Sequence, residues 1–377
     1  MKMKKITALL LALAMSLSLA ACGGDSAPAG GSTPAPTEPA AQTSESADES
    51  GQTVILDRNG DVYAEVEDAD APTEYPVTLT DQAGREVTIE AKPETLVSGY
   101  YISTSLCIAL GLQDQLVGIE AKADTRPIYA RSAPGLLELP SVGTAKEFDL
   151  EGCAALAPDL VILPLKLQDA ADSLAELGIP ALVVNPEDQT LLEEAVALVA
   201  AATDTRARAA QLADFTVKQQ NRLTELLADA ERPNVYLAGN SDFLSTAGGA
   251  MYQSSMIEMA GGRNVAQEIT DTYWASVSYE QILTWNPDYI VLASDADYTV
   301  EDVMTDPNLA GCKAVENGDV LQIPGDAEAW DSPVPGGILG SVWLSGALHP
   351  DLGIDGENMQ IINEFYETFY GFTYQEI

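Results

Sequence analysis

Hydrophobic residues along this chain alternate between short, fully apolar runs and longer stretches in which they recur at helical spacing. The short runs predict buried strands, and the longer stretches predict amphipathic helices. Strand–helix alternation of this kind predicts an α/β protein with largely parallel sheets covered by helices on both faces. The predicted strands occupy residues 96–101, 116–120, 139–143, 159–164 and 181–185, and, after a gap, 234–239, 288–294 and 319–325.

The gap between these two sets of strands holds residues 203–232, which lie in the longest stretch of the chain without glycine or proline. Apolar residues at helical spacing predict one helix here, of roughly 28 residues and about 42 Å. Thr203 and Asp204 offer N-cap oxygens at its start, and Pro233 prevents its continuation. We expect this helix to link two α/β lobes; a long surface helix of a single domain is the alternative.

The segments on either side of this helix, residues 75–202 and 233–377, are each of single-lobe size. They hold comparable elements in a similar order, without a detectable sequence repeat, which predicts an N-terminal and a C-terminal lobe. A passage at 52–74 turns at Asn59-Gly60 and predicts an accessory hairpin. A second hairpin, which turns at Ala83-Gly84, is expected to begin the first lobe.

The N-terminus has the features of a secretory signal. Lys2, Lys4 and Lys5 precede an apolar run at residues 6–19, which is short for a membrane span. Leu19-Ala20-Ala21-Cys22 resembles the bacterial lipobox, in which the cysteine is lipidated and becomes the first residue. We therefore predict a lipoprotein signal peptide at 1–21, lipidation of Cys22 and an extracytoplasmic protein anchored to the outer face of the cell membrane. An ordinary signal peptide is the alternative.

Residues 23–51 contain no large apolar side chain, so they cannot bury enough surface to offset chain entropy. We predict that residues 22–51 form a disordered tether. The full chain has 18 Lys and Arg against 58 Asp and Glu, a net charge of −40. This charge argues against nucleic acid and against an anionic membrane surface as partners.

Cysteine and histidine usage restricts the chemistry of the protein. Beyond Cys22 the chain has Cys107, Cys153 and Cys312, an odd and widely spaced set that predicts neither a disulfide framework nor a zinc site, although one pair could bridge. His349 is the single histidine, so the sequence predicts no histidine-based metal site. Phosphate-loop, dinucleotide, serine-hydrolase and zinc-protease motifs are all absent from the sequence, and we predict a protein that is not an enzyme.

Polar and aromatic side chains follow the ends of several predicted strands in both lobes. Because ligands bind outside the carboxyl ends of strands in open α/β sheets, these side chains are candidates to line a cleft. Their flat aromatic faces suit a rigid, partly hydrophobic small ligand; core packing is the alternative for any single aromatic. The candidates are Tyr100, Tyr101, Thr144, Lys146 and Lys166 in the first lobe, and Tyr252, Tyr273, Trp274, Ser294, Trp330 and Asp331 in the second.

Four segments, residues 77–89, 141–162, 256–266 and 277–292, carry a family resemblance through their sequence, order and spacing. With them the chain resembles the substrate-binding lipoproteins of iron-siderophore, haem and cobalamin ABC transporters. The resemblance implies the class III periplasmic-binding-protein fold, in which one long backbone helix joins two Rossmann-like α/β lobes with mainly parallel sheets. It also implies a ligand in the cleft, little hinge bending and no catalysis.

The resemblance further implies partners. One glutamate per lobe docks onto the permease in this family, and the matching positions are Glu151 and Glu280. Both also stand near predicted helix N-termini, where a carboxylate is stabilised by the helix dipole. We expect a monomeric receptor that serves an ABC permease and its ATPase, without a resident cofactor or protein metal site.

Ferric siderophore is the preferred ligand, because the resemblance covers receptors for metal chelates. A corrinoid, haem or a molybdate-type oxyanion is the alternative. The chain departs from the siderophore binders for anionic chelates that it resembles, which usually carry arginine in the cleft, because its first-lobe loop carries Ala145 beside Lys146. A sensory or interaction lipoprotein of the same fold is the alternative from another functional class.

Overall fold

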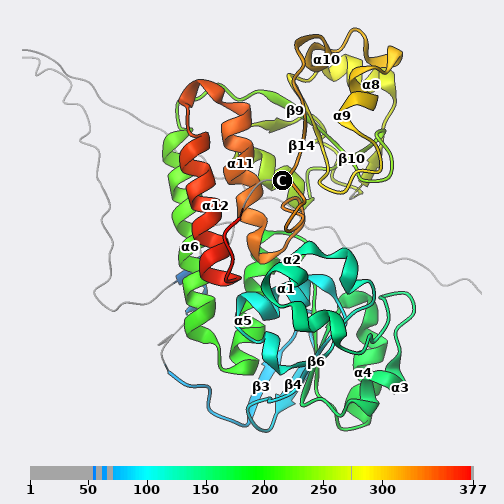
Figure 1. Ribbon diagram of the computed structural model, residues 1–377, viewed down its shortest axis with the longest axis vertical. Coiled ribbons are helices and arrows are strands. Elements are labelled where there is room, and N and C mark those ends of the chain that lie inside the picture. Colours follow the sequence, from blue (N-terminus) through cyan, green and yellow to red (C-terminus); the bar gives the residue numbers. More distant parts are fainter. Residues whose placement is uncertain (1–53, 57–61, 66–70, 273, 375–377) are drawn as a thin grey trace, which may run out of the picture. The chain divides into compact units, whose positions relative to one another are not determined.

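The computed structural model describes residues 54–56, 62–65, 71–272 and 274–374, all of which belong to the unit formed by residues 50–377. The predicted signal peptide, the tether and Cys22 lie outside the described residues. Two lobes are visible within the described part of the chain (Figure 1). They correspond to the two sets of strands that the hydrophobic pattern predicts.

A four-stranded parallel sheet forms the centre of the first lobe, in the order β6-β5-β7-β8. Its strands span Leu116–Gly118 (β6), Leu96–Ser98 (β5), Leu160–Pro164 (β7) and Ala181–Val184 (β8). Alternate side chains of β7 enter two different cores, with Ile162 on one face of the sheet and Val161 on the other. Both faces are therefore covered, as the apolar runs predict.

Helices lie on both sides of this sheet. The face of Ile162 packs against α1 (Tyr101–Ala109) and α5 (Gln189–Thr203), and the face of Val161 packs against α3 (Leu150–Ala155) and α4 (Gln168–Glu176). The short helix α2 (Pro127–Ser132) contacts α1. The run predicted as a strand at 139–143 forms only isolated bridges, so that prediction is wrong. Pro140 lies at its start and lacks a backbone N–H for the ladder.

The second lobe has a mixed sheet in the order β12-β10-β9-β13-β14, with β11 also paired to β9. Strands β9, β11, β13 and β14 are parallel. Strand β10 is antiparallel to both of its neighbours, β9 and β12. The strands are β9 (Asn234–Ala238), β10 (Ser245–Ala247), β11 (Arg263–Asn264), β12 (Trp274–Ser276), β13 (Tyr289–Leu292) and β14 (Val320–Gln322).

Alternation also organises the core of this lobe. Tyr236 and Ile290 pack in one cluster, which includes residues of α8 (Tyr279–Trp285) and α9 (Val300–Met304). Val235 and Val291 point to the opposite cluster, with α7 (Tyr252–Met259) and α11 (Ile338–Leu348). The remaining helices are α10 (Lys313–Asn317) and α12 (Asp355–Phe369).

Two antiparallel hairpins precede the parallel sheet of the first lobe. Strands β3 (Val77–Thr80) and β4 (Glu86–Ile89) flank the predicted turn, in which Gly84 has a φ of 76° that favours glycine. The N–H of Gln82 donates to the carbonyl of Val183 at 3.1 Å, which docks this hairpin on β8. Strands β1 (Val54–Leu56) and β2 (Val62–Glu65) also pair, while Asn59 and Gly60 lie outside the described residues.

The linking helix is shorter than the sequence predicts. Helix α6 spans Arg206–Leu226, and Thr203 belongs instead to the preceding helix α5. Asp204 has a left-handed conformation with φ 59°. This conformation ends α5 and changes the direction of the chain before α6 begins. Its carboxylate accepts the N–H of Thr73 at 2.7 Å and pairs with Lys92 at 2.9 Å. The predicted bounds 203–232 are therefore wrong at both ends.

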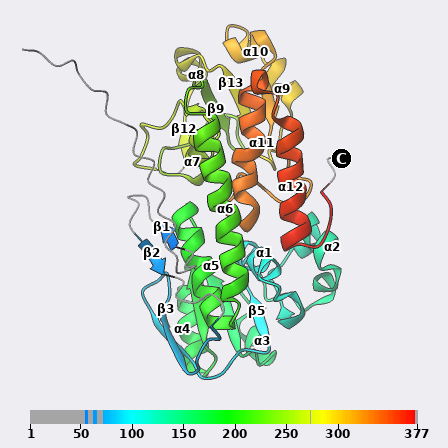
Figure 2. The ribbon, with the colours of Figure 1, turned by 90° about the vertical axis from the view of Figure 1, so that its left-hand side faces the viewer.

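Helix α6 is not alone between the lobes. Helices α6, α11 and α12 run side by side in two perpendicular views, and α11 contacts both of the others (Figures 1 and 2). One hydrophobic cluster includes Leu96 of the first lobe, Phe215 of α6 and Val235 of the second lobe. The two-lobed α/β fold is confirmed, but a shared core joins the lobes in addition to the backbone helix.

Candidate ligand-binding site

A cavity of about 560 Å³ lies between the two lobes, outside the carboxyl ends of β5, β8 and β9. This is the position at which open α/β sheets bind ligands. Residues of both lobes contribute to its walls. They are Tyr100, Tyr101, Ile102, Pro186 and Glu187 from the first lobe, and Asn240, Ser241, Asp242, Ser245, Met251, Tyr252, Gln253, Trp274, Asp331, Ser332 and Pro333 from the second.

The first-lobe wall is formed by the transition from β5 to α1. Tyr100 precedes the helix in an extended conformation and makes no side-chain cap, so the first N–H groups of α1 have no capping side chain. The rings of Tyr100 and Tyr101 meet edge to face at 5.1 Å. Gly99 lets the chain between them and the strand pass close to β7, since a Cβ there would lie 2.6 Å from Leu163 Cδ2.

The second-lobe wall has the same construction. Helix α7 begins at Tyr252 after Met251, which also makes no side-chain cap. Gln253 is 7% exposed, lines the cavity, and its Oε1 has no hydrogen-bond partner among the described residues. Two helix N-termini therefore border one cavity, and N-termini favour ligand atoms with partial negative charge.

Trp274 supplies a flat face at the edge of the cavity. Its side chain is 38% exposed, which is unusual for the largest apolar side chain. Gly239 at the end of β9 makes room for the indole, because a Cβ there would lie 2.9 Å from Trp274 Cζ3. Exposed aromatic surface beside a concave site is suited to stacking against a planar or apolar part of a ligand.

Carboxylates are the charged groups of the cavity wall. Glu187, Asp242 and Asp331 line it, and among the described residues that do so there is no lysine or arginine. Asp331 is 3% exposed and accepts the Ser294 hydroxyl at 2.6 Å and the Ser294 N–H at 3.3 Å. Burial raises the pKa of Asp331 above its usual value, against the opposing effect of the Ser294 hydroxyl.

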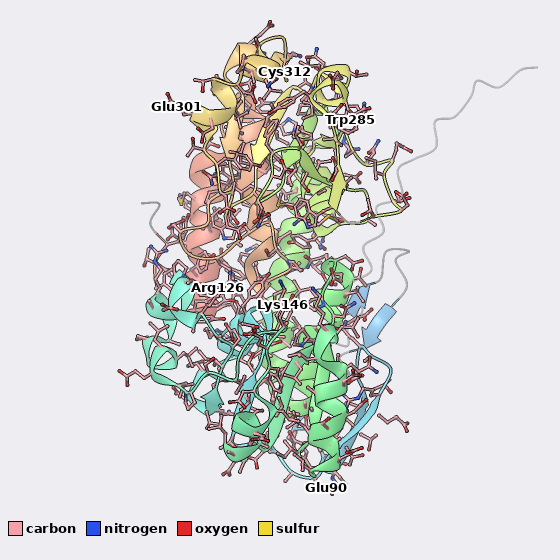
Figure 3. The ribbon with its side chains drawn as sticks, turned by 90° about the vertical axis from the view of Figure 1, so that its right-hand side faces the viewer. Glu90, Arg126, Lys146, Trp285, Glu301 and Cys312 are labelled. Carbon is pink, nitrogen blue, oxygen red and sulfur yellow. The ribbon has the colours of Figure 1, made fainter. Side chains whose placement is uncertain are left out.

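A cation stands next to the cavity rather than in it. The guanidinium carbon of Arg126 lies 4.2 Å from the ring centre of Tyr101, in a cation–π contact. Arg126 lines a smaller cavity of about 100 Å³ that shares Tyr101 with the main one and also includes Ser294 and Glu328. Figure 3 shows Arg126 and Lys146 on the side of the first lobe that faces the second lobe.

The tyrosines of the cavity stay neutral. Burial raises the pKa values of Tyr100, Tyr101 and Tyr252 above the usual value of a phenol. Asp331 raises the pKa of Tyr252 further, because a second negative charge nearby is unfavourable. These side chains are therefore hydroxyl donors at neutral pH, not phenolates.

Five of the eleven predicted ligand-binding residues line the cavity: Tyr100, Tyr101, Tyr252, Trp274 and Asp331. Ser294 lies behind the wall, where it holds Asp331. Tyr273 lies outside the described residues.

The other four predicted residues do not line the cavity. Trp330 is 1% exposed, because its side chain points into the core and not into the cavity that the neighbouring Asp331 lines. Its indole N–H donates to Tyr366 at 2.7 Å. Thr144 caps its own loop by accepting the N–H groups of Lys146 and Glu147. Lys146 and Lys166 are exposed outside the cavity wall.

Several wall residues were not predicted from the sequence. Glu187 follows β8, while Asn240 and Asp242 follow β9. The rule that placed Tyr100 applies equally to these strand exits, so their position was a usable signal. Gln253 had no such signal, because only the packing of α7 determines which of its first residues faces the cavity.

The two predicted docking glutamates occupy matching places on the surface. Glu151 is in the first turn of α3, where Asp149 accepts the Gly152 N–H at 2.9 Å. Glu280 is in the first turn of α8, where Ser278 accepts the Gln281 N–H at 3.2 Å. Both side chains are exposed, each two residues after its N-cap, one on each lobe.

The three described cysteines, Cys107, Cys153 and Cys312, are free and buried. Burial raises the pKa of Cys107 to about 12 and that of Cys153 to about 11, so these thiols are protonated. In the described ranges, no three His, Cys, Asp or Glu residues gather as metal ligands. None of the helices described is both long and apolar enough to cross a bilayer.

Comparison with known proteins agrees with this geometry. The chain is 27% identical over 324 residues to the molybdate-binding protein MolA of Haemophilus influenzae, covering 79% of this chain and 92% of that one. It is 29% identical over 219 residues to a vitamin B12-binding protein of Yersinia pestis, covering 58% and 72%. The structure of MolA bound to molybdate superimposes with a TM-score of 0.70 at 25% identity, over 79% of this chain and 99% of MolA.

A periplasmic solute-binding protein of Veillonella parvula also has a TM-score of 0.70, at 26% identity, over 80% of this chain and 94% of its own. The names of these relatives describe binding proteins, not enzymes. The periplasmic binding protein family model matches residues 96–327, which cover most of both lobes. The chain therefore belongs to the periplasmic binding protein family, the extracytoplasmic solute-binding proteins of ABC transporters.

Proposed function

We propose that this protein binds a neutral or cationic metal chelate, with a ferric hydroxamate siderophore as the first choice, and delivers it to an ABC importer. The observation that carries the proposal is the charge of the cavity wall, where Glu187 and Asp242 have no lining lysine or arginine to balance them. A ligand with several negative charges would be repelled there. A positive or neutral complex would not.

The charge of the whole chain acts in the same direction. A net charge of −40 produces a negative potential that attracts cations and repels anions before they reach the cleft. The two helix N-termini at Tyr101 and Tyr252 complement this arrangement, because they favour the partially negative oxygens on the surface of a hydroxamate complex.

The size of the cavity also favours a chelate over a small ion. Its volume of about 560 Å³ lies within the range of drug-sized ligand sites, which is about 300–1,000 Å³. Neutral tyrosines and Trp274 offer stacking surface and hydroxyl donors for a complex whose metal is already fully coordinated. A tetrahedral oxyanion would leave most of this space to water.

Molybdate is the second candidate, because the relative MolA is named for binding it and covers 79% of this chain. The uncapped N-termini of α1 and α7 could hold an oxyanion through backbone N–H groups. Against this candidate stand the carboxylates of Glu187 and Asp242 in the wall and the excess volume. Corrinoid, which the Yersinia relative is named for, is larger than the cavity as it stands.

The permease is proposed to contact Glu151 and Glu280, which lie exposed at matching helix starts on the two lobes. The anchor is proposed to be a lipid on Cys22, with residues 22–51 as the tether between membrane and receptor. The receptor is proposed to act as a monomer, since the docking positions on both lobes must be free to reach one permease.

Titration of tryptophan fluorescence tests the ligand class. Ferric complexes quench nearby indoles, and Trp274 is an exposed indole at the cavity. We expect saturable quenching by cationic ferrioxamine B and by neutral ferrichrome, and none by a ferric tris-catecholate or by molybdate. Trp274→Phe should remove most of the signal.

Trp285→Phe is the matched control, because Trp285 packs against Tyr236 inside the second lobe, away from the cavity wall. It should leave the titration unchanged. Binding of molybdate alone would replace the chelate proposal with the oxyanion candidate. A flat response to ferric hydroxamates, catecholates, haem, cobalamin and molybdate would overturn the receptor assignment for all of these ligands.

A further inference from the structure

Residues 370–374 follow α12 and contact both lobes, and two of their tyrosine side chains are buried. Tyr370 is 4% exposed and Tyr374 is 2% exposed. We call residues 370–374 the C-terminal strap, and its contacts on both sides show what it holds.

On the second-lobe side the strap holds the loop at residues 326–333. The hydroxyl of Tyr374 donates to Asp326 Oδ1 at 2.5 Å, and the Tyr374 ring lies 5.4 Å from that of Trp330. Tyr366 of α12 stacks on Tyr374 at 5.4 Å and also accepts the indole N–H of Trp330 at 2.7 Å. The loop is thus fixed at two of its residues.

On the first-lobe side the strap reaches α1 and α2. The hydroxyls of Tyr370 and Ser105 are hydrogen-bonded at 2.8 Å. The guanidinium of Arg131 lies 5.2 Å from the ring of Phe372, and its Nη1 pairs with Asp326 Oδ2 at 3.3 Å. Asp326 is therefore shared by one side chain from the strap and one from the first lobe.

These contacts bear directly on the cavity. The loop that the strap holds continues from Trp330 into Asp331, Ser332 and Pro333, all of which line the second-lobe wall. Helix α1, which Tyr370 contacts through Ser105, begins with the cavity residues Tyr101 and Ile102. The family model ends at residue 327, so the strap lies beyond the segment that matches the family.

We propose that the C-terminal strap positions the binding site: it holds the loop at 326–333 against α1 and α2 and thereby sets the width of the cavity. No strap residue lines the cavity, so the strap acts through Asp331 and its neighbours. The effect on ligand affinity rests on the proposed function. The effect on the loop does not.

The competing explanation is that the strap only completes the hydrophobic core. In that case loss of one polar contact would lower the stability of the whole molecule and would not increase opening of the loop at 326–333 in particular. Hydrogen exchange distinguishes the two, because it reports local opening segment by segment.

The variant Tyr374→Phe keeps the ring and removes the bond to Asp326. Measured on the full chain without ligand, we expect amide exchange in residues 326–337 to rise by about fivefold or more, with little change in β5, β7, β9 and β13. With ferrioxamine B as the probe, we expect Kd to rise by about three- to tenfold, mainly through faster dissociation.

Tyr279→Phe is the matched control, since Tyr279 also donates to an aspartate, Asp306, at 2.7 Å, but entirely within the second lobe. It should change neither exchange at 326–337 nor the affinity. Asp326→Asn provides a second variant that leaves the aromatic packing intact, should Tyr374→Phe not fold.

Unchanged exchange at 326–337 in both strap variants would overturn the positioning role, and so would acceleration spread evenly over both lobes. If wild-type protein does not bind ferrioxamine B, the proposed function fails, yet the exchange experiment still decides the role of the strap. If the probe binds and loop exchange rises but Kd stays unchanged, the strap does not set the binding geometry.

Discussion

Glu328 is a single buried residue at the contact between the two lobes that makes the stability of the folded protein depend on pH. Its side chain is 7% exposed, and the Ser105 hydroxyl of the first lobe donates to its Oε1. Burial raises the pKa of this carboxyl to about 7, against opposing hydrogen bonds from Ser105 and Gly336. The folded protein therefore holds a proton that the unfolded chain releases at lower pH.

The sign of the effect follows from this difference. Below pH 4.5, the value taken for the unfolded chain, both states are protonated and the contribution of Glu328 is fully present. As pH rises from there to about 7, the unfolded chain loses the proton first, so the stability of the folded state falls. The loss is complete only above the folded-state pKa.

Glu328→Gln should remove this pH dependence, because the amide keeps an acceptor for Ser105 and never ionises. We expect the variant to match wild type near pH 4.5 and to gain about 2 kcal/mol relative to it at pH 8. Urea unfolding at both pH values measures this difference. The control Glu138→Gln, at an exposed residue, should have the same free energy of unfolding as wild type at both pH values. If the stability of Glu328→Gln changed with pH as much as that of wild type, Glu328 would not be the source of the pH dependence.

For the cavity wall, the sequence predicts which loops contribute better than it predicts which side chains of those loops face the ligand. The strand exits near Tyr100 and Asp331 are predicted from the sequence and do line the cavity. Trp330 and Asp331 illustrate the limit, since adjacent residues point in opposite directions, and only the packing of Tyr366 and Tyr374 decides which one enters the core.

Helix starts are the elements that carry the proposed permease contacts. Glu151 and Glu280 each stand two residues after an N-cap whose side chain is hydrogen-bonded, so both carboxylates are presented by a fixed first turn. Hydrogen bonding at this turn lowers the pKa of Glu280, so its carboxylate keeps a full negative charge in mildly acidic surroundings.

Charge reversal at these starts tests their role. Glu151→Lys combined with Glu280→Lys should reduce uptake of the bound ligand in cells by about tenfold or more, with unchanged Kd for the purified receptor. Glu301→Lys is the matched control, because Glu301 is exposed in the first turn of α9, also two residues after its N-cap. Uptake at the wild-type rate in the double variant would exclude these docking positions.

The position of helices was easier to predict than their ends. Apolar spacing places a long helix correctly between the two sets of strands, where α6 lies, because it reflects which face is buried. The break at Asp204 carries no glycine or proline, and its left-handed conformation depends on contacts with Thr73 and Lys92 that lie far away in the sequence. Local pattern contains no information about such contacts.

The described two-lobed unit as a whole is held together by more than its linking helix. The cluster that includes Leu96, Phe215 and Val235 is continuous from one lobe to the other, and Arg208 of α6 bonds to both Ala109 and Thr368. Bending the lobes apart would expose this core to water. The sequence predicted two lobes, whereas the shared core could not be predicted, since it forms between residues that are distant along the chain.

Limited closure on ligand binding follows from this core. We expect crystal structures with and without the bound chelate to differ by a lobe rotation of no more than about 10°. Unliganded and liganded full chains should also give nearly superimposable small-angle scattering curves. A rotation of tens of degrees would show that the shared core separates on binding.

The shared core has a further consequence for transport. If the lobes keep their angle, Glu151 and Glu280 stand at the same separation in empty and loaded receptors. Empty and loaded receptors would then present nearly identical docking surfaces to the permease. Empty receptors would therefore occupy docking positions that loaded receptors need. Import would depend on the fraction of receptors that are filled as much as on their number, so that making more receptor during scarcity of the nutrient could slow its uptake.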